Sequence, residues 1–214
     1  MKRRTIDLVM SAAGLLLAAI LLVGGLVLTS NANFAKNYVA DQLGQQKISF
    51  TAADKLSDEE KTQTCLVQYA GQPMTTGKQA ECYANDFIGL HLKGIAGGKT
   101  YADLGAPQSA LREQVAAAQA SNAANLADLQ KQLADVTAQR ETVFKGETLR
   151  GLLLTSYGFS EFGAKAAQAA TVAYLAAALM ALLAALGFIH AFVIPRNRAF
   201  APVEETQRKE TVRT

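Results

Sequence analysis

Two long apolar segments stand near opposite ends of a chain whose middle is polar. The 21 residues from Leu8 to Leu28 carry no charge, and neither does the segment Ala166–Ile194. Each is long enough to cross the roughly 30 Å hydrocarbon layer of a membrane as an α-helix. We therefore expect transmembrane helices over residues 8–30 and 166–194.

The first apolar segment has one alternative, the apolar region of a cleaved signal peptide. That region is usually about 7–15 residues long, which is shorter than the segment here. The small residues that follow it make a weak cleavage site, and no cysteine follows for lipid attachment. An uncleaved membrane anchor is the preferred interpretation.

Basic residues flank the two expected spans on the sides that face the chain ends. Lys2, Arg3 and Arg4 precede the first span, and the segment 195–214 after the second span contains five Lys and Arg residues. The positive-inside rule then places residues 1–7 and 195–214 in the cytoplasm. The middle of the chain is expected outside the cytoplasm, and the protein in the cytoplasmic (inner) membrane.

The middle of the chain is almost neutral. Residues 29–165 contain 13 Lys and Arg against 14 Asp and Glu. A basic patch that would bind nucleic acid is not indicated, so the membrane bilayer and other membrane proteins are the expected partners.

Residues 31–107 are predicted to form a small helical domain after a short extended segment, "KISF". Ser57 and Glu60 have the spacing of a capping box, which starts a helix toward Tyr69. Apolar residues between Ala80 and Leu92 recur at three- and four-residue spacing, which is one face of a second helix beginning near Thr76.

The two cysteines of the chain, Cys65 and Cys82, lie on either side of the turns between these helices. Outside the cytoplasm, cysteines tend to be oxidised, so an even count favours one disulfide that joins the two helices. Free thiols and a metal site are the alternatives. A zinc site needs about four ligands, and His91 is the one further donor that stands out nearby.

Residues 108–145 are expected to form one long polar helix, because neither Pro nor Gly occurs from Gln108 to Phe144 and good helix formers dominate. A weak heptad pattern runs through it. The helix is expected to pack on its own domain, with an intermolecular coiled coil or a contact with another protein as alternatives.

Residues 146–165 are expected to lie along the outer membrane surface and to bend into the second span. This interfacial segment is apolar but is interrupted by Gly151, Gly158 and Gly163 and by Glu161 and Lys165, and its aromatic residues suit the headgroup level. These residues are Tyr157, Phe159 and Phe162.

Small residues recur on both expected spans, and small residues let helices approach closely in lipid. The predicted packing positions are Gly24, Gly25, Ala170, Ala177 and Ala184. The two spans are expected to pack on each other through these positions, with docking on a larger membrane protein as a further use of the same face.

The sequence predicts no catalytic, cofactor-binding or metal-binding residues. The two histidines, His91 in the middle domain and His190 near the cytoplasmic end of the second span, are about a bilayer thickness apart. They cannot share a metal within one chain. A catalytic role for His91 with Asp86 or Asp103 and a serine is an alternative, but the chain has no nucleophile-elbow motif.

The segments "ECYANDFIGLHLKGIAGGKTYADLG" and "ETLRGLLLTSYGFSEFG" resemble a family of small actinobacterial two-span membrane proteins. Some members of that family are labelled "aromatic ring-opening dioxygenase". The resemblance implies two spans and an extracytoplasmic domain, and it supplies no catalytic residues. Respiratory supercomplexes of such bacteria recruit small accessory subunits of similar build.

The sequence therefore predicts an all-α membrane protein with two transmembrane helices, a mainly helical extracytoplasmic domain between them and a long polar helix leading to the second span. The expected function is that of a non-enzymatic accessory or scaffold subunit of a larger membrane complex, with a cytochrome bc–oxidase supercomplex as the candidate complex. A homo-oligomer is possible but not favoured. An envelope sensor with a ligand-binding extracytoplasmic domain is the alternative.

Overall fold

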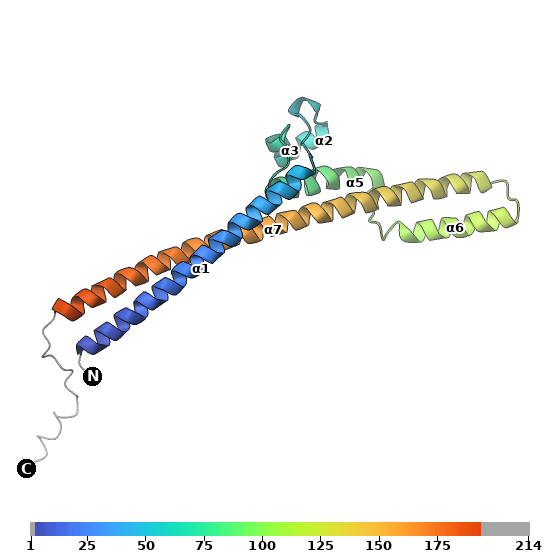
Figure 1. The fold of residues 1–214 in the computed structure, drawn as a ribbon. Helices are drawn as coiled ribbons and strands as arrows, with labels where there is room; N and C mark the ends of the chain where they lie inside the picture. The colour runs from blue at the N-terminus through green and yellow to red at the C-terminus, as the bar shows by residue number, and fades with distance from the viewer. Residues whose placement is uncertain (1–2, 194–214) are drawn as a thin grey trace, which may run out of the picture. The chain divides into compact units, whose positions relative to one another are not determined.

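The computed structural model describes residues 3–193, all of whose regular elements are helices (Figure 1). The chain divides into two compact units, one formed by the residues up to Ala32 together with those from Ala164, the other by Asn33–Gly163. The elements are α1 (Arg3–Gln45), η1 (Ala53–Lys55), α2 (Asp58–Lys61), α3 (Thr64–Tyr69), α4 (Gly77–Cys82), η2 (Tyr83–Ile88), α5 (Gly89–Ala96), α6 (Gly105–Ala120) and α7 (Leu126–Val193).

The first unit is an antiparallel pair made of the first part of α1 and the last part of α7. Both helices are long and apolar enough to cross a membrane. Only 11% of the most apolar window of each is buried, whereas the core helix of a soluble protein would be mostly buried. The predicted pair of apolar helices is confirmed. The predictions for residues 1–2 and 194–214 lie outside the described residues.

The second unit packs the end of α1, the short helices and the first part of α7 around two apolar clusters. The largest fully buried side chains are Leu66, Met74, Leu104 and Val143. A smaller cluster of Ala96, Leu104 and Val143 lies apart from the main cluster. The main cluster joins Val39 and Leu43 of α1 to Leu153 of α7.

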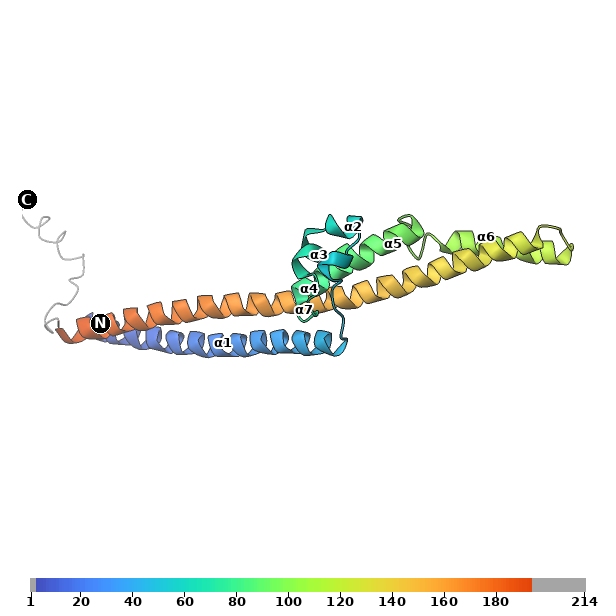
Figure 2. The same ribbon diagram turned by 90° about the horizontal axis from the view of Figure 1, so that it is seen from above.

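The helix that begins at α4 continues through a π-helical stretch, η2, into α5. It follows α7 closely, since a Cβ added to Gly146 would meet the Leu92 side chain at 2.6 Å. A Cβ added to Gly77 would likewise clash with Ser160. These two glycines allow the close approach of the two helices, seen from above in Figure 2.

The capping box predicted from the sequence is present. Ser57 accepts a hydrogen bond from the Glu60 main-chain N–H, and the Glu60 carboxylate accepts one from the Ser57 N–H. The segment that follows is two short helices, α2 and α3, rather than one. Ser49 forms an isolated β-bridge with Pro73, which agrees with the extended conformation expected for "KISF".

The single long helix predicted over residues 108–145 is wrong. Helix α6 ends at Ala120, and α7 starts at Leu126, so the segment folds back as a helical hairpin. Asn122 adopts a positive φ of 48°, a conformation that ends helices and that asparagine tolerates better than most residues. Helix-forming composition alone did not reveal this break.

Residues 146–165, for which a bend into the second span was expected, are helical throughout. α7 passes through this segment and into the apolar part as one 68-residue helix. A glycine inside a helix costs only about 1 kcal/mol relative to alanine, and its neighbours here are good helix formers. The four glycines of the segment therefore do not interrupt the helix.

Candidate functional site

The two cysteines meet between α3 and α4. The Cys65 and Cys82 sulfur atoms lie at disulfide distance, with Cα atoms 6.0 Å apart, inside the usual range for a disulfide. Cys82 is buried within the core and Cys65 packs against it. The arrangement joins the two neighbouring helices, as the sequence predicted.

A carboxylate that the sequence analysis did not connect with the cysteines lies beside them. The Asp86 carboxylate Oδ2 is 2.8 Å from Cys65 Sγ. The two cysteine sulfurs and one carboxylate oxygen of Asp86, the atoms that could ligate a metal, lie within 4.8 Å of one another. Asp86 follows Cys82 by four residues, so helical spacing could have indicated it. A thiolate metal site would require both sulfurs to be reduced, because a disulfide sulfur is not a thiolate ligand.

His91 lies at the capping box rather than beside the acidic residues considered for a triad. Its Nδ1 is 2.7 Å from the Phe87 main-chain oxygen, so this nitrogen carries the proton, because a carbonyl can only accept. Its Nε2 faces the buried Glu60 carboxylate at 3.7 Å. Hydrogen bonds and ion pairs of the described residues do not join His91 to Asp86 or Asp103.

A polar cluster surrounds Lys78 on the outside of α4. Its ammonium group donates to the Tyr157 hydroxyl at 3.0 Å and to Glu81 at 3.3 Å, and it lies 3.5 Å from Glu161. The hydrogen bond to Tyr157 is the main reason that the pKa of Lys78 is raised. Tyr157, predicted as an interfacial residue, thus fastens α7 to α4.

The other two predicted interfacial residues differ in their surroundings. Phe159 packs edge-to-face on Tyr38, with ring centroids 5.7 Å apart, and on Phe34 at 6.3 Å. Phe162 is 78% exposed. One aromatic side chain that packs on α1, Phe159, and one that is exposed, Phe162, therefore lie just before the apolar part of α7.

The predicted packing positions on α7 face α1. Ala170, Ala177 and Ala184 are all buried. On α1, a Cβ at Gly25 would meet the Tyr174 ring at 2.6 Å, but a Cβ at Gly24 would have no atom within 4 Å. Gly24 therefore does not contribute to the packing, because it lies about 100° around the helix from Gly25.

Two polar contacts join the pair of apolar helices, and neither was predicted from the sequence. The Thr29 and Tyr174 hydroxyls share a hydrogen bond of 2.9 Å. His190 Nδ1 lies 3.1 Å from the Asp7 carboxylate. Both pairs join residues more than 140 positions apart, so a local pattern could not reveal them, although Asp7 is the acidic residue that directly precedes the first span.

An exposed aromatic and basic patch lies where α6 and α7 meet. The Tyr101 and Phe144 rings are 5.5 Å apart, and the Arg140 guanidinium lies 4.0 Å from the Tyr101 ring centroid. Arg140 also donates to Gln108 Oε1 at 2.6 Å and to the Tyr101 main-chain oxygen at 3.3 Å. Tyr101 is 42% exposed and Phe144 is 55% exposed.

We call these three side chains the Tyr101–Phe144 patch. Tyr101 is separated from the other two by about 40 residues, so a local pattern in the sequence does not bring the three together. Comparison of the chain with protein-family models, curated proteins and solved structures found no match.

Proposed function

We propose that this protein is a non-enzymatic accessory or scaffold subunit of a larger integral membrane complex. The pair of apolar helices anchors it in the membrane, and the unit Asn33–Gly163 docks on the extracytoplasmic face of the complex through the Tyr101–Phe144 patch. Both chain termini are cytoplasmic in this arrangement, as the basic residues at the ends of the chain favour.

The observation that carries the proposal is the exposure of the Tyr101–Phe144 patch. Tyr and Arg are the side chains that most often dominate protein–protein binding energy, and exposed aromatic residues are enriched at interfaces. Arg140 is held by Gln108 and by the Tyr101 main chain. The patch is therefore ordered before a partner binds, which lowers the entropic cost of binding.

A cytochrome bc–oxidase assembly is the first candidate for the complex, because the resemblance noted for the sequence points to actinobacterial two-span proteins of this build. This candidate is an analogy of architecture, and the docking proposal does not depend on it.

Co-purification tests the proposal. The full chain carrying a cytoplasmic affinity tag is expressed in its own cells, extracted in mild detergent and isolated with its partners, which are identified by mass spectrometry. We expect stoichiometric recovery of the subunits of one integral membrane complex. Recovery of the chain only as a free monomer or homo-oligomer would contradict docking on a larger complex.

A matched pair of variants tests the patch. Phe144→Ala is expected to lower recovery of the partner at least about fivefold, since truncating an interface anchor costs about 1–2 kcal/mol or more. Phe162→Ala is the control, because Phe162 is the same residue type on the same helix and is more exposed. Equal losses in the two variants would exclude the patch as the docking surface.

A further inference from the structure

The Tyr101–Phe144 patch borders a small hollow between α6 and α7, within the unit Asn33–Gly163. The volume of the hollow is about 230 Å³, below the range of about 300–1,000 Å³ that is typical of small-molecule sites. It therefore suits one side chain of a partner rather than a whole soluble ligand. We call it the Arg112–Arg140 hollow, and its lining residues beyond the patch are Gln108, Arg112, Thr137 and Glu141.

Helical spacing brings the lining residues to one side of each helix. Arg112 follows Gln108 by four residues on α6, and Phe144 follows Arg140 by four residues on α7, so each pair shares a helix face. Two cationic side chains, one from each helix, therefore line the same hollow.

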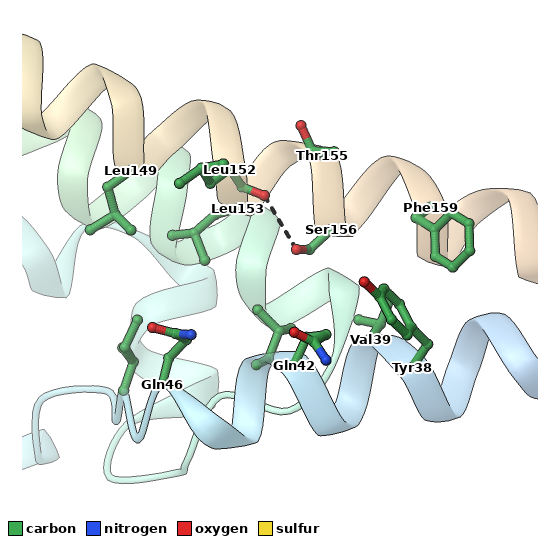
Figure 3. Close-up of a pocket in the computed structure, with 12 residues that line it drawn as sticks. Tyr38, Val39, Gln42, Gln46, Leu149, Leu152, Leu153, Thr155, Ser156 and Phe159 are labelled. Atoms are coloured by element: carbon green, nitrogen blue, oxygen red, sulfur yellow. Dashed lines mark hydrogen bonds between the residues drawn. The ribbon is translucent and has the colours of Figure 1, made fainter.

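The charges distinguish this hollow from the one between the end of α1 and the middle of α7, which Figure 3 shows. None of the residues that line that second hollow, all of them within the described range, is Asp, Glu, Lys or Arg. The second hollow therefore offers no counter-charge to an ionic group, whereas the Arg112–Arg140 hollow offers two.

Arg140 is held in place with one of its terminal nitrogens left over. Its Nη1 donates to Gln108 Oε1 and its Nε donates to the Tyr101 main-chain oxygen. Gln108 is itself buried, and its Nε2 donates to the Thr137 hydroxyl at 2.8 Å, which fixes the direction of the amide. Among the hydrogen bonds of residues 3–193, none involves Nη2 of Arg140. Both N–H donors of this nitrogen are left for an occupant.

The positive charge of the hollow is not balanced by carboxylates of the chain. Across the described part of the molecule, the ion pairs involve neither Arg112 nor Arg140. Glu141 is the acidic residue in the lining, and its carboxylate lies 3.9 Å from the Lys145 ammonium. Since the lysine offsets this carboxylate, the two guanidinium groups leave the hollow with an excess of positive charge.

We propose that the Arg112–Arg140 hollow receives the carboxylate of a glutamate or aspartate side chain from an extracytoplasmic segment of the docking partner. This inference rests on the proposed function and adds the chemistry of the partner. A carboxylate accepts hydrogen bonds in the planar arrangement in which a guanidinium group donates them. The exposed rings of Tyr101 and Phe144 give the methylene groups that carry the carboxylate an apolar surface to pack on.

Carbodiimide cross-linking of the purified complex tests this contact. The reagent joins an amine to a carboxylate that it touches, forming an amide with net loss of one water molecule. Arg112→Lys keeps the positive charge and supplies the amine. We expect a cross-link between position 112 of this variant and an Asp or Glu of the partner, located by peptide mass spectrometry. Gln114→Lys is the matched control and should give none, since Gln114 is an exposed residue of α6 outside the lining, about 200° around the helix from Arg112.

Reversal of the charge provides a second test. Arg112→Glu is expected to lower recovery of the partner at least about tenfold, because like charges that meet across an interface repel. Lys131→Glu makes the same change of charge at an exposed residue of α7 outside the lining, and it should leave recovery unchanged. Replacing the cross-linked acidic residue of the partner by Lys should restore recovery of the Arg112→Glu variant. Equal helix content by circular dichroism shows that the variants fold.

The outcomes separate this inference from the proposed function. Equal recovery of the partner with Arg112→Glu and Lys131→Glu would overturn the acidic contact while docking stands. A loss confined to Arg112→Glu, without a carboxylate cross-linked at position 112, would also overturn it, because the occupant would then be another anion such as a phosphate group. Failure of any partner to co-purify with the wild-type chain would contradict both proposals.

Discussion

Arg150 donates a hydrogen bond of 3.0 Å from Nε to the main-chain oxygen of Ala84. The same oxygen accepts the N–H of Gly89, five residues later, as in a π-helix. The two terminal nitrogens of Arg150 bond Glu147 on its own helix and the Asn85 side chain across the contact. A single side chain of α7 thus holds the irregular turn of η2.

Removing this side chain should loosen η2. Arg150→Ala leaves the Ala84 oxygen and the Asn85 amide with one partner fewer, at a cost of about 1–3 kcal/mol for partly buried groups. We expect amide hydrogen exchange over residues 84–92 to accelerate by about tenfold or more, with exchange in the apolar helix pair unchanged. Arg112→Ala, which removes an exposed arginine of α6, is the control. Equal exchange in wild type and Arg150→Ala would contradict the role.

The Cys65–Cys82 pair should be oxidised in protein taken from the membrane. Closing a loop with a sequence separation of 17 stabilises a fold by about 3 kcal/mol in the chain-entropy model. We expect no maleimide-reactive thiol in denatured, unreduced protein and two after reduction. The double variant Cys65→Ser, Cys82→Ser should unfold its short helices at lower denaturant. Two reactive thiols in the unreduced sample would contradict the disulfide.

Features encoded within a few neighbouring residues were predictable from the sequence. The capping box at Ser57 and Glu60 and the helical face around Cys82 depend on local spacing, and the structure contains both. The pair of apolar helices was predictable for a similar reason, because the length of an uncharged segment shows directly whether a helix of it can cross the hydrocarbon layer of a bilayer.

Features that depend on tertiary contact were not predictable in this way. The break before α7 needs one positive φ at Asn122, and helix-forming neighbours hide such a residue. Asp7 and His190 lie 183 positions apart, so their contact follows only from the antiparallel packing of two helices. The Tyr101–Phe144 patch likewise appears only once α6 folds back along α7.

The conformation of Asn122 can be tested directly. A β-branched residue is disfavoured at positive φ, so Asn122→Val should cost about 1–2 kcal/mol, whereas Asn122→Gly should be neutral or slightly stabilising. Asn125→Val is the control, because Asn125 lies in the same connection without a positive φ. Hydrogen exchange of the α6 amides is the measurement. Equal exchange in Asn122→Val and Asn125→Val would show that residue 122 does not need this conformation.

Tyr83 should titrate at higher pH than the exposed tyrosines. Its partial burial, and secondarily the Glu60 carboxylate, raises its pKa above the ordinary value of about 10. The fold therefore favours the protonated phenol. The contribution of Tyr83 to the free energy of unfolding is fully present below pH 10, the ordinary pKa of tyrosine. It is lost as the pH rises through the higher pKa that Tyr83 has in the folded protein.

The difference in absorbance at 295 nm between wild type and Tyr83→Phe isolates this titration. We expect its midpoint above that of the remaining tyrosines, and we expect Tyr83→Phe to lose stability less steeply at alkaline pH than the wild type. A difference titration centred at or below pH 10 would contradict the burial of Tyr83 between Phe50 and Phe87.

The neighbouring glycines of α1 provide a matched test of the packing of the two apolar helices. A Cβ at Gly25 would press on the Tyr174 ring at 2.6 Å, and that ring carries the hydroxyl bonded to Thr29. Gly25→Ala must therefore displace the ring or separate the helices, and overpacking of this kind typically costs about 1–3 kcal/mol. Gly24→Ala adds the same methyl group where no atom lies within 4 Å.

Cysteine cross-linking measures the separation of the two helices. A Cβ at Gly14 would lie 3.5 Å from the Ala184 Cβ, which suits a disulfide. In a background of Cys65→Ser and Cys82→Ser, the pair Gly14→Cys and Ala184→Cys should cross-link when membranes are treated with a mild oxidant. Gly25→Ala is expected to lower the yield severalfold and Gly24→Ala to leave it unchanged. Equal yields in these two variants would show that Gly25 and Tyr174 do not meet in the membrane, because only that contact distinguishes the two substitutions.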